Sequence, residues 1–302
     1  MTSLRTRGDD AETTSDPASA NTSQRPKRMS AWRSSTRGES VTVLFWQLVL
    51  FFGFLAGWEW LPTVPFLSKH FLFFQRFFIS SPIGVAKMVF YLATGKNYIA
   101  TIWGPLGHTL SAALGGTICA IISGAVLGLL FSHNAYSYRI FRPFIVALNA
   151  VPRVAIIPII IILVKSAEMT DAVTAFTVVF FLVFFNAFEG GRSVPIEVIQ
   201  NVKILGGTAA TVLWRVRWRY VLAWTFASLP NAVTFGIVGS VTAELFTGSS
   251  GIGQILIAAV DEANAALTFG VVTVLTICSL LLVMGSDVAR RRLLVWWDGG
   301  GR

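Results

Sequence analysis

The sequence predicts an all-α integral membrane protein with about six membrane-spanning helices. Hydrophobic residues make up 54% of the 302-residue chain and charged residues 13%, whereas a soluble domain is expected to be about a quarter charged. The mean hydropathy is +0.66. The apolar residues also gather in runs of about twenty, the length that a helix needs to cross the hydrocarbon of a bilayer. These observations exclude a soluble globular protein.

The N-terminal part of the chain is predicted to form a tail, a span and an external segment. Residues 1–40 are rich in Ser, Thr, Arg and Asp, so we expect a disordered cytoplasmic tail with little to bury. The first apolar run starts too far from Met1, and is too long, to be the core of a signal peptide. Residues 41–104 hold a first span, over residues 41–61, and an amphipathic segment against the outer membrane face. An additional short span within residues 69–103 is the alternative.

The core of the chain, residues 105–290, is predicted to hold five further spans. They cover residues 105–131, 140–164, 172–188, 220–246 and 268–289. The first of these carries many small residues, which allow helix backbones to approach closely in lipid. The second contains Pro152 and Pro158, which cannot donate backbone hydrogen bonds, so it is predicted to be kinked or broken. Broken backbone at membrane depth should be covered by protein or line a cavity.

The distribution of basic residues orients the predicted spans. All but six of the 24 Lys and Arg residues lie in four places: the N-terminal tail, the turn at Arg139 and Arg142, residues 192–219, and the tail at residues 291–302 with the residue just before it. Because Lys and Arg accumulate on the cytoplasmic side, both termini and residues 193–219 are predicted to be cytoplasmic. The net charge of +9 is thus explained by topology, and no nucleic-acid partner is expected. The six exceptions are Lys69, Arg76, Lys87, Lys96, Arg153 and Lys165.

Residues 193–219 form a long polar interruption between two apolar runs. Their apolar residues recur at three- and four-residue steps, as on one face of a helix. Gly206 and Gly207 interrupt this pattern, and glycine permits the positive φ that a sharp turn needs. We therefore expect two short helices that meet at a glycine corner and form a compact cytoplasmic knob. An ordinary basic loop is the alternative that charge alone allows.

Arg153 is the most unusual charged residue, because it lies inside a predicted span. At 1.5 Å per residue it lies roughly 16 Å beyond Arg142. An arginine at the membrane centre costs roughly 2.5 to 3.5 kcal/mol, so its side chain is expected inside the bundle. It could make a structural pair there, or provide an electropositive lining for an anionic solute.

No group of residues indicates catalysis or a metal site. The sequence lacks H-E-x-x-H, G-x-S-x-G and P-loop patterns, and His70, His108 and His133 are scattered without paired metal-ligand spacing. Cys119 and Cys278 lie in apolar spans and are expected to pack as small hydrophobic residues. We therefore expect no enzyme activity, cofactor or metal. An intramembrane or lipid-modifying enzyme is the alternative class, and it would need paired polar catalysts at similar depth.

The polar interruption resembles the cytoplasmic loop of permease subunits of ATP-binding-cassette (ABC) importers. The family motif reads E-A-A, three residues, G, nine residues, I, one residue, L-P. It falls without a gap on Gln200-Asn201-Val202, Gly206, Val216, Trp218 and Arg219. The glycine and two apolar positions match, whereas the Glu-Ala-Ala and the proline do not.

Two further stretches resemble the same family and occur in the right order. Residues 146–163 are similar to the span before the loop, with its paired prolines, and residues 243–257 to the alanine-glutamate and glycine-apolar-glycine signature after it. The resemblance runs from about residue 80 to residue 297 and is nearest to the nitrate, sulfonate and taurine branch. The matching residues are Pro152, Pro158, Glu244, Gly251 and Gly253. Basic residues are common in this family at the place of Arg153, which favours its structural interpretation.

The resemblance implies a type I ABC importer permease-like bundle in the cell membrane. Two copies would enclose a pathway, with a second copy of this chain as the expected partner and a different permease as the alternative. An extracytoplasmic solute-binding protein would deliver nitrate, a sulfonate, taurine or a pyrimidine-type precursor, and two separate ATPase subunits would hydrolyse ATP. The residues implied in ATPase coupling are Glu197, Gln200, Val202, Gly206, Gly207, Val216 and Trp218. Those implied in the pathway or its gate are Pro152, Arg153, Pro158, Glu244, Gly251 and Gly253.

Overall fold

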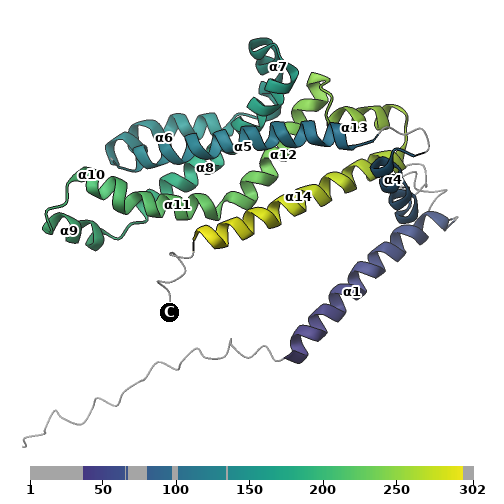
Figure 1. Cartoon of the computed structure of the whole chain (residues 1–302), viewed down its shortest axis with the longest axis horizontal. Coiled ribbons are helices and arrows are strands. Elements are labelled where there is room, and N and C mark those ends of the chain that lie inside the picture. The colour runs from purple at the N-terminus through teal and green to yellow at the C-terminus, as the bar shows by residue number, and fades with distance from the viewer. Residues whose placement is uncertain (1–36, 65, 67–79, 97–100, 134, 295–302) are drawn as a thin grey trace, which may run out of the picture. The chain divides into compact units, whose positions relative to one another are not determined.

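The computed structural model describes residues 37–64, 66, 80–96, 101–133 and 135–294, and the structural statements below concern these residues. Within these ranges the regular structure is helical, without strands. The contacts divide the chain into two units, Met1–Phe54 and Leu55–Arg302, which are considered separately. Figure 1 shows the helices in chain order. The expected tail at residues 1–40 lies almost entirely outside the described residues.

Helix α1 (Arg37–Trp60) accounts for the described part of the first unit and continues into the second. Its section Thr42–Trp60 is long and apolar enough to cross a membrane. Large apolar side chains such as Phe45 and Phe52 occur on all its faces and are exposed, as expected of a helix surrounded by lipid. This agrees with the span predicted over residues 41–61. A single 3-10 turn, η1 (Leu61–Thr63), follows it.

Four more helices are long and apolar enough to span a membrane, which confirms the all-α membrane fold. They are α5 (Trp103–Ser132), α8 (Ala167–Arg192), α12 (Leu229–Thr247) and α14 (Ala265–Leu293). Helices α5 and α8 pack along each other (Figure 1). A Cβ added at Gly116 of α5 would lie 2.2 Å from the carbonyl oxygen of Ala172 in α8. The small residues predicted to permit close packing therefore lie at this contact.

The span predicted over residues 140–164 is broken into two helices. Helix α6 (Ala135–Ala150) ends before Pro152, whose extended backbone (φ −63°, ψ 115°) precedes α7 (Arg153–Val164). The break expected from the prolines is therefore present at Pro152. Helix α7 continues through Pro158, so the second proline does not divide it.

The span predicted over residues 220–246 also consists of two helices, contrary to expectation. Helix α11 (Trp218–Ala227) ends at Ser228, and α12 begins at the next residue. Pro230 lies in the first turn of α12 and has no backbone N–H for the preceding helix. Because proline is tolerated at a helix start and not in its interior, the chain restarts its helix there.

Two short apolar helices complete the bundle. Helix α4 (Pro82–Thr94) starts at the capping hydroxyl of Ser81 and ends at Gly95, whose φ is +65°. It packs against α14 and the start of α13 (Ile252–Asp261) in an apolar cluster that includes Leu92, Val271 and Ile252. With 13 residues, α4 is too short to span a bilayer. Residues 67–79 of the predicted external segment lie outside the described residues.

Candidate functional site

The polar segment after α8 contains a sharp corner at Gly206 and Gly207. Helix α9 (Ile196–Ile204) is followed by Gly206 with φ +81°. The N–H of Gly206 donates to the carbonyl of Lys203 (3.0 Å), and that of Gly207 to the carbonyl of Val202 (2.8 Å). This pair of bonds is the Schellman pattern that closes a helix C-terminus. The corner predicted from the two glycines is thus present.

The two glycines meet different requirements. Gly206 needs the left-handed backbone, while a Cβ at this position would meet nothing within 4 Å. A Cβ at Gly207 would lie 2.5 Å from Cγ1 of Val202. Helix α10 (Ala209–Thr211) then begins at Thr208, whose side chain accepts a hydrogen bond from the N–H of Thr211 (3.3 Å). It continues through a π-helical segment, η3 (Val212–Arg217), into α11, so the second arm of the corner is longer than expected.

The tip of this segment exposes large apolar side chains. Ile204 is 81% exposed and Leu205 87%. Leu205 belongs to the apolar periodicity of this segment, yet α9 has no buried residue. Glu197 and Gln200 are exposed as well. The tip lies outside the candidate spans.

The base of the segment is packed into the bundle. Val212 is buried, and Trp218 packs against a cluster from α5, α8 and α11 that includes Leu129. Val216 is half-buried. The guanidinium of Arg217 donates from Nη1 to the carbonyl of Ser132 at the end of α5. Burial, and then the charge of Arg192, lowers the pKa of Arg217 below its ordinary value. The tip is therefore exposed on a base that is fixed to α5 and α8.

Glu244, Gly251 and Gly253 form one contact at the other end of the bundle. Glu244 lies in the last turns of α12 with no exposed surface, and its Oε2 accepts a hydrogen bond from the N–H of Gly253 (2.8 Å). A Cβ at Gly251 would lie 2.2 Å from the carboxyl carbon of Glu244, and one at Gly253 would lie 2.6 Å from its Cβ. The turn into α13 is thus closed directly over the carboxylate. Figure 1 shows α13 at the end of the bundle opposite to α9 and α10.

Of the remaining pathway candidates, Pro152 directly precedes α7 and Pro158 lies in the middle of this helix. Pro152 and Pro158 are both exposed, whereas Ile157 and Ile160 are the buried residues of α7. In this single chain α7 turns its isoleucines and not its prolines toward the bundle, so the expectation that the break is covered by protein or lines a cavity stays a prediction. The side chain of Arg153 lies outside the described part of the structure.

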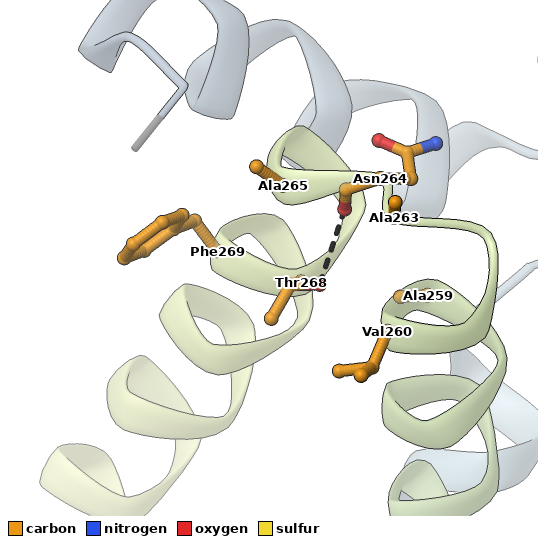
Figure 2. Close-up of a pocket in the computed structure, with 7 residues that line it drawn as sticks. All are labelled: Ala259, Val260, Ala263, Asn264, Ala265, Thr268 and Phe269. Carbon is orange, nitrogen blue, oxygen red and sulfur yellow. Dashed lines mark hydrogen bonds between the residues drawn. The ribbon is translucent and has the colours of Figure 1, made fainter. Parts of the chain in front are cut away.

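A small hollow separates the end of α13 from the start of α14. It has a volume of about 260 Å³ and is shown in Figure 2. Its lining residues are Ala259, Val260, Ala263, Asn264, Ala265, Thr268 and Phe269. The hydroxyl of Thr268 is already used, since it donates to the carbonyl of Asn264 (3.1 Å). Its lining contains no charged side chain.

Together, the five long apolar helices of the described residues define a multi-pass membrane protein. The chain belongs to the family of binding-protein-dependent transport system inner membrane components, whose model matches residues 116–294. It is 24% identical over 243 residues to the taurine transport system permease protein TauC of Escherichia coli, covering 80% of this chain and 86% of the relative. It is 26% identical over 223 residues to the riboflavin transport system permease protein RibX of Chloroflexus aurantiacus (74% and 82%). A probable ABC transporter permease of Haemophilus influenzae is 23% identical over 221 residues (73% and 88%).

The family determines the class of function. The chain is a membrane-embedded permease component of an ABC importer, and ATP is hydrolysed by a separate subunit. An intramembrane or lipid-modifying enzyme is therefore not supported. The family also implies ATPase and substrate-binding partners in general terms.

Sequence reasoning missed two groups of residues. Ile204 was not singled out, although two large apolar residues directly before a glycine pair in a polar segment are a readable signal. Three other residues, His108, Thr109 and Asp171, surround the contact of Glu244 with α13. They come from helices far apart in the chain, so no local spacing could have grouped them.

Proposed function

We propose that residues 193–219 bind the ATPase subunits through the exposed apolar tip at Ile204 and Leu205. An apolar surface that faces water is the usual mark of a protein interaction site. The single observation that carries this proposal is the exposure of these two side chains beside a rigid glycine corner. Glu197, Gln200, Val202, Gly206 and Gly207 would shape this surface, and Val216 and Trp218 would support it from the base.

The anchoring of the base explains how movement of the ATPases would reach the bundle. The corner is closed by two backbone hydrogen bonds, and Arg217 ties the base to the end of α5. A displacement of the tip would therefore move α5 and α8 with little deformation of the loop itself. Rocking of these helices against the second permease is the motion that alternating access requires.

Leu205→Asp is the direct test of this surface, with Leu205→Met as the matched control. The aspartate places a charge in the proposed interface, whereas methionine keeps its size and apolar character. Because Leu205 is exposed, neither variant should alter insertion or stability of the permease. We expect Leu205→Asp to abolish copurification of the ATPase subunits and uptake, and Leu205→Met to retain both. Normal ATPase binding by Leu205→Asp would exclude the tip as the docking site.

The orientation proposed from the basic residues places this tip in the cytoplasm together with both termini. Thr208, beside the corner, is exposed, and so is Thr63, in the 3-10 turn η1 that follows α1. In intact cells an impermeant thiol reagent should label Thr63→Cys and leave Thr208→Cys unlabelled. Cys119 is exposed on α5 instead of packed as expected. Labelling of the wild type must therefore be measured as the background. The reverse labelling pattern would overturn both the orientation and the coupling role.

The solute is proposed to be a small molecule of the nitrate, sulfonate, taurine or pyrimidine-precursor type. Relatives are named for taurine, aliphatic sulfonates, formylaminopyrimidine and nitrate, and one for riboflavin. Similar bundles thus serve different solutes, so selection would rest with the extracytoplasmic binding protein. Calorimetric binding of these solutes to that protein is the measurement that decides; binding of none of them would contradict the proposal.

The second permease of the transporter is proposed to be another copy of this chain. The exposed Pro158 favours a neighbour on its side of α7, and Arg153 at the start of this helix would then lie at the interface or the pathway. Glu244, Gly251 and Gly253 would belong to the outer gate. Homodimers are the commoner form of oligomer. Two differently tagged copies should copurify in an active transporter, and recovery of a distinct permease instead would show a heterodimer.

A further inference from the structure

The contact around Glu244 includes two more ionisable side chains from separate helices. His108 lies in α5, Asp171 in α8 and Glu244 in α12. One ligand-type atom of each lies within 4.8 Å of the others. Nδ1 of His108 is 3.9 Å from Oε1 of Glu244. Asp171 and Glu244 have no exposed surface, and the side chain of His108 is 17% exposed.

In each of the three side chains one polar atom has a polar contact and the other has no hydrogen-bond partner. Oδ1 of Asp171 accepts a hydrogen bond from the hydroxyl of Thr247 (3.0 Å), and Oε2 of Glu244 accepts one from the N–H of Gly253. Nε2 of His108 faces Oε1 of Glu168 at 3.5 Å. The atoms left without a hydrogen-bond partner are Nδ1 of His108, Oδ2 of Asp171 and Oε1 of Glu244.

We propose that these three atoms bind a divalent cation of the zinc type. Zinc sites use imidazole nitrogen and carboxylate oxygen at about 2.0 to 2.2 Å, which sets neighbouring ligands roughly 3.4 Å apart. The separation of 3.9 Å between His108 and Glu244 is too long for a hydrogen bond. It is close to the spacing that such a cation requires, and the three ligands need to move inward by roughly 1 Å or less each. A direct hydrogen-bond network would instead have brought these atoms together.

The surroundings resemble the outer shell of a metal site. Ligating histidines commonly place their second nitrogen against a carboxylate, and ligating carboxylates are themselves hydrogen-bonded. Glu168, Thr247 and Gly253 supply these contacts. Glu168 is also 79% exposed, so the cluster has an entry from water on the side of His108. The hydroxyl of Thr109 is a neutral polar neighbour of the Glu244 carboxylate, and the hydroxyl of Ser249 is one of the Asp171 carboxylate.

Charge favours a bound cation at this position. Among the described side chains, no lysine or arginine forms an ion pair with Asp171 or Glu244, and His108 is the basic side chain within 4.0 Å of Glu244. Two buried carboxylates without compensation are costly, and a divalent cation neutralises both. Such an ion would join α5, α8 and α12 at the end of the bundle that lies opposite to the exposed tip. This proposal departs from the expectation of no metal site, and it does not depend on the proposed coupling role.

Zinc titration of the full-length permease with its ATPase subunits in lipid nanodiscs tests the proposal. The protein should carry no polyhistidine tag and be treated with a chelator first. We expect one Zn²⁺ per permease copy in competition with a fluorescent chelator, and no displacement by Ca²⁺, which prefers six to eight oxygen ligands. His108→Gln and Asp171→Asn should each weaken binding at least about tenfold.

Two controls separate a built site from surface binding. Asp287→Asn removes a carboxylate of α14 that is paired with Arg290 and Arg291, and it should leave zinc affinity unchanged. Equal affinity of the wild type and Asp171→Asn, or no stoichiometric binding by the wild type, would overturn the proposal. If the variants fail to assemble, the zinc X-ray absorption spectrum of the wild type decides. One imidazole nitrogen with carboxylate oxygens supports the site, and a shell without imidazole refutes it.

Discussion

The two ends of the bundle depart from the ordinary distribution of side chains in opposite ways. At the tip of residues 193–219, Ile204 and Leu205 are apolar and exposed. Around α13, Asp171 and Glu244 are ionisable and buried. Apolar residues outside lipid and unpaired carboxylates inside protein are both unfavourable for an isolated chain. The two proposals follow from this difference: a protein surface would complete one end and a cation the other.

Glycine serves the two ends for different physical reasons. Gly206 is needed for its positive φ, and the space around it is open. Gly251 and Gly253 have negative φ or ordinary helical backbone, and they are needed because Glu244 occupies the space of a Cβ. Substitutions at the corner should therefore alter coupling with little loss of stability, whereas those beside Glu244 should alter assembly first.

The largest effect is expected at the buried end, from Gly251→Ala and Gly253→Ala. Each added methyl group overlaps Glu244, and overpacking typically costs about 1 to 3 kcal/mol. Thermal unfolding of the nanodisc complex should show a clear loss of stability for both. Glu244→Ala removes the carboxyl group that Gly251→Ala meets, but it keeps the Cβ that Gly253→Ala meets. The double variant Gly251→Ala/Glu244→Ala should thus lose less stability than the sum of the losses in the two single variants.

The same design can contradict the packing argument. If Gly253→Ala is relieved by Glu244→Ala as strongly as Gly251→Ala is, overlap with the Cβ of Glu244 is not the cause. Additive effects in both double variants would show that the glycines and Glu244 act independently. The comparison between the two ends would then lose its structural basis.

An intermediate effect is expected at the corner, from Gly206→Val compared with Gly206→Asn. Left-handed backbone costs most residues roughly 1 to 2 kcal/mol, and a β-branched residue is among the least tolerant, whereas asparagine adopts this conformation readily. Gly206→Val should retain ATP hydrolysis and lose several-fold in solute uptake in proteoliposomes. Gly206→Asn should keep solute uptake near that of the wild type. Equal uptake by both variants would show that the backbone conformation at the corner is not required.

Sequence reasoning predicted the parts of the fold that depend on local composition and periodicity. Long apolar runs located α5, α8 and α14, and paired glycines located the corner. It failed where a single proline inside an apolar run decided the outcome, since Pro230 divides the predicted span whereas Pro158 leaves α7 intact. The exposure of Leu205 could not be predicted, because periodicity shows a helix face without showing what covers it.

The cluster around Glu244 shows a second limit of sequence reasoning. Glu244, Gly251 and Gly253 were grouped by their resemblance to a family signature, and they do meet in space. His108 and Asp171 belong to the same contact, yet they come from two other helices. Their proximity depends on how α5, α8 and α12 pack, which no spacing along the chain encodes. Packing between distant helices is therefore what the structure adds to the site.

The smallest effect is expected at the base of the exposed segment, from Arg217→Met with Arg219→Met as its control. Arg217 is half-buried and donates to the carbonyl of Ser132, whereas Arg219 is exposed. A hydrogen bond from a charged group contributes about 1.5 to 3 kcal/mol, but methionine recovers part of this through apolar packing beside Trp218. Arg217→Met should therefore increase amide hydrogen exchange in residues 212–220 and reduce uptake modestly, and Arg219→Met should do neither. Faster exchange with unchanged uptake would mean that the base holds the tip in place without transmitting its movement. The comparison would then be between a docking surface at one end and a closed polar cluster at the other.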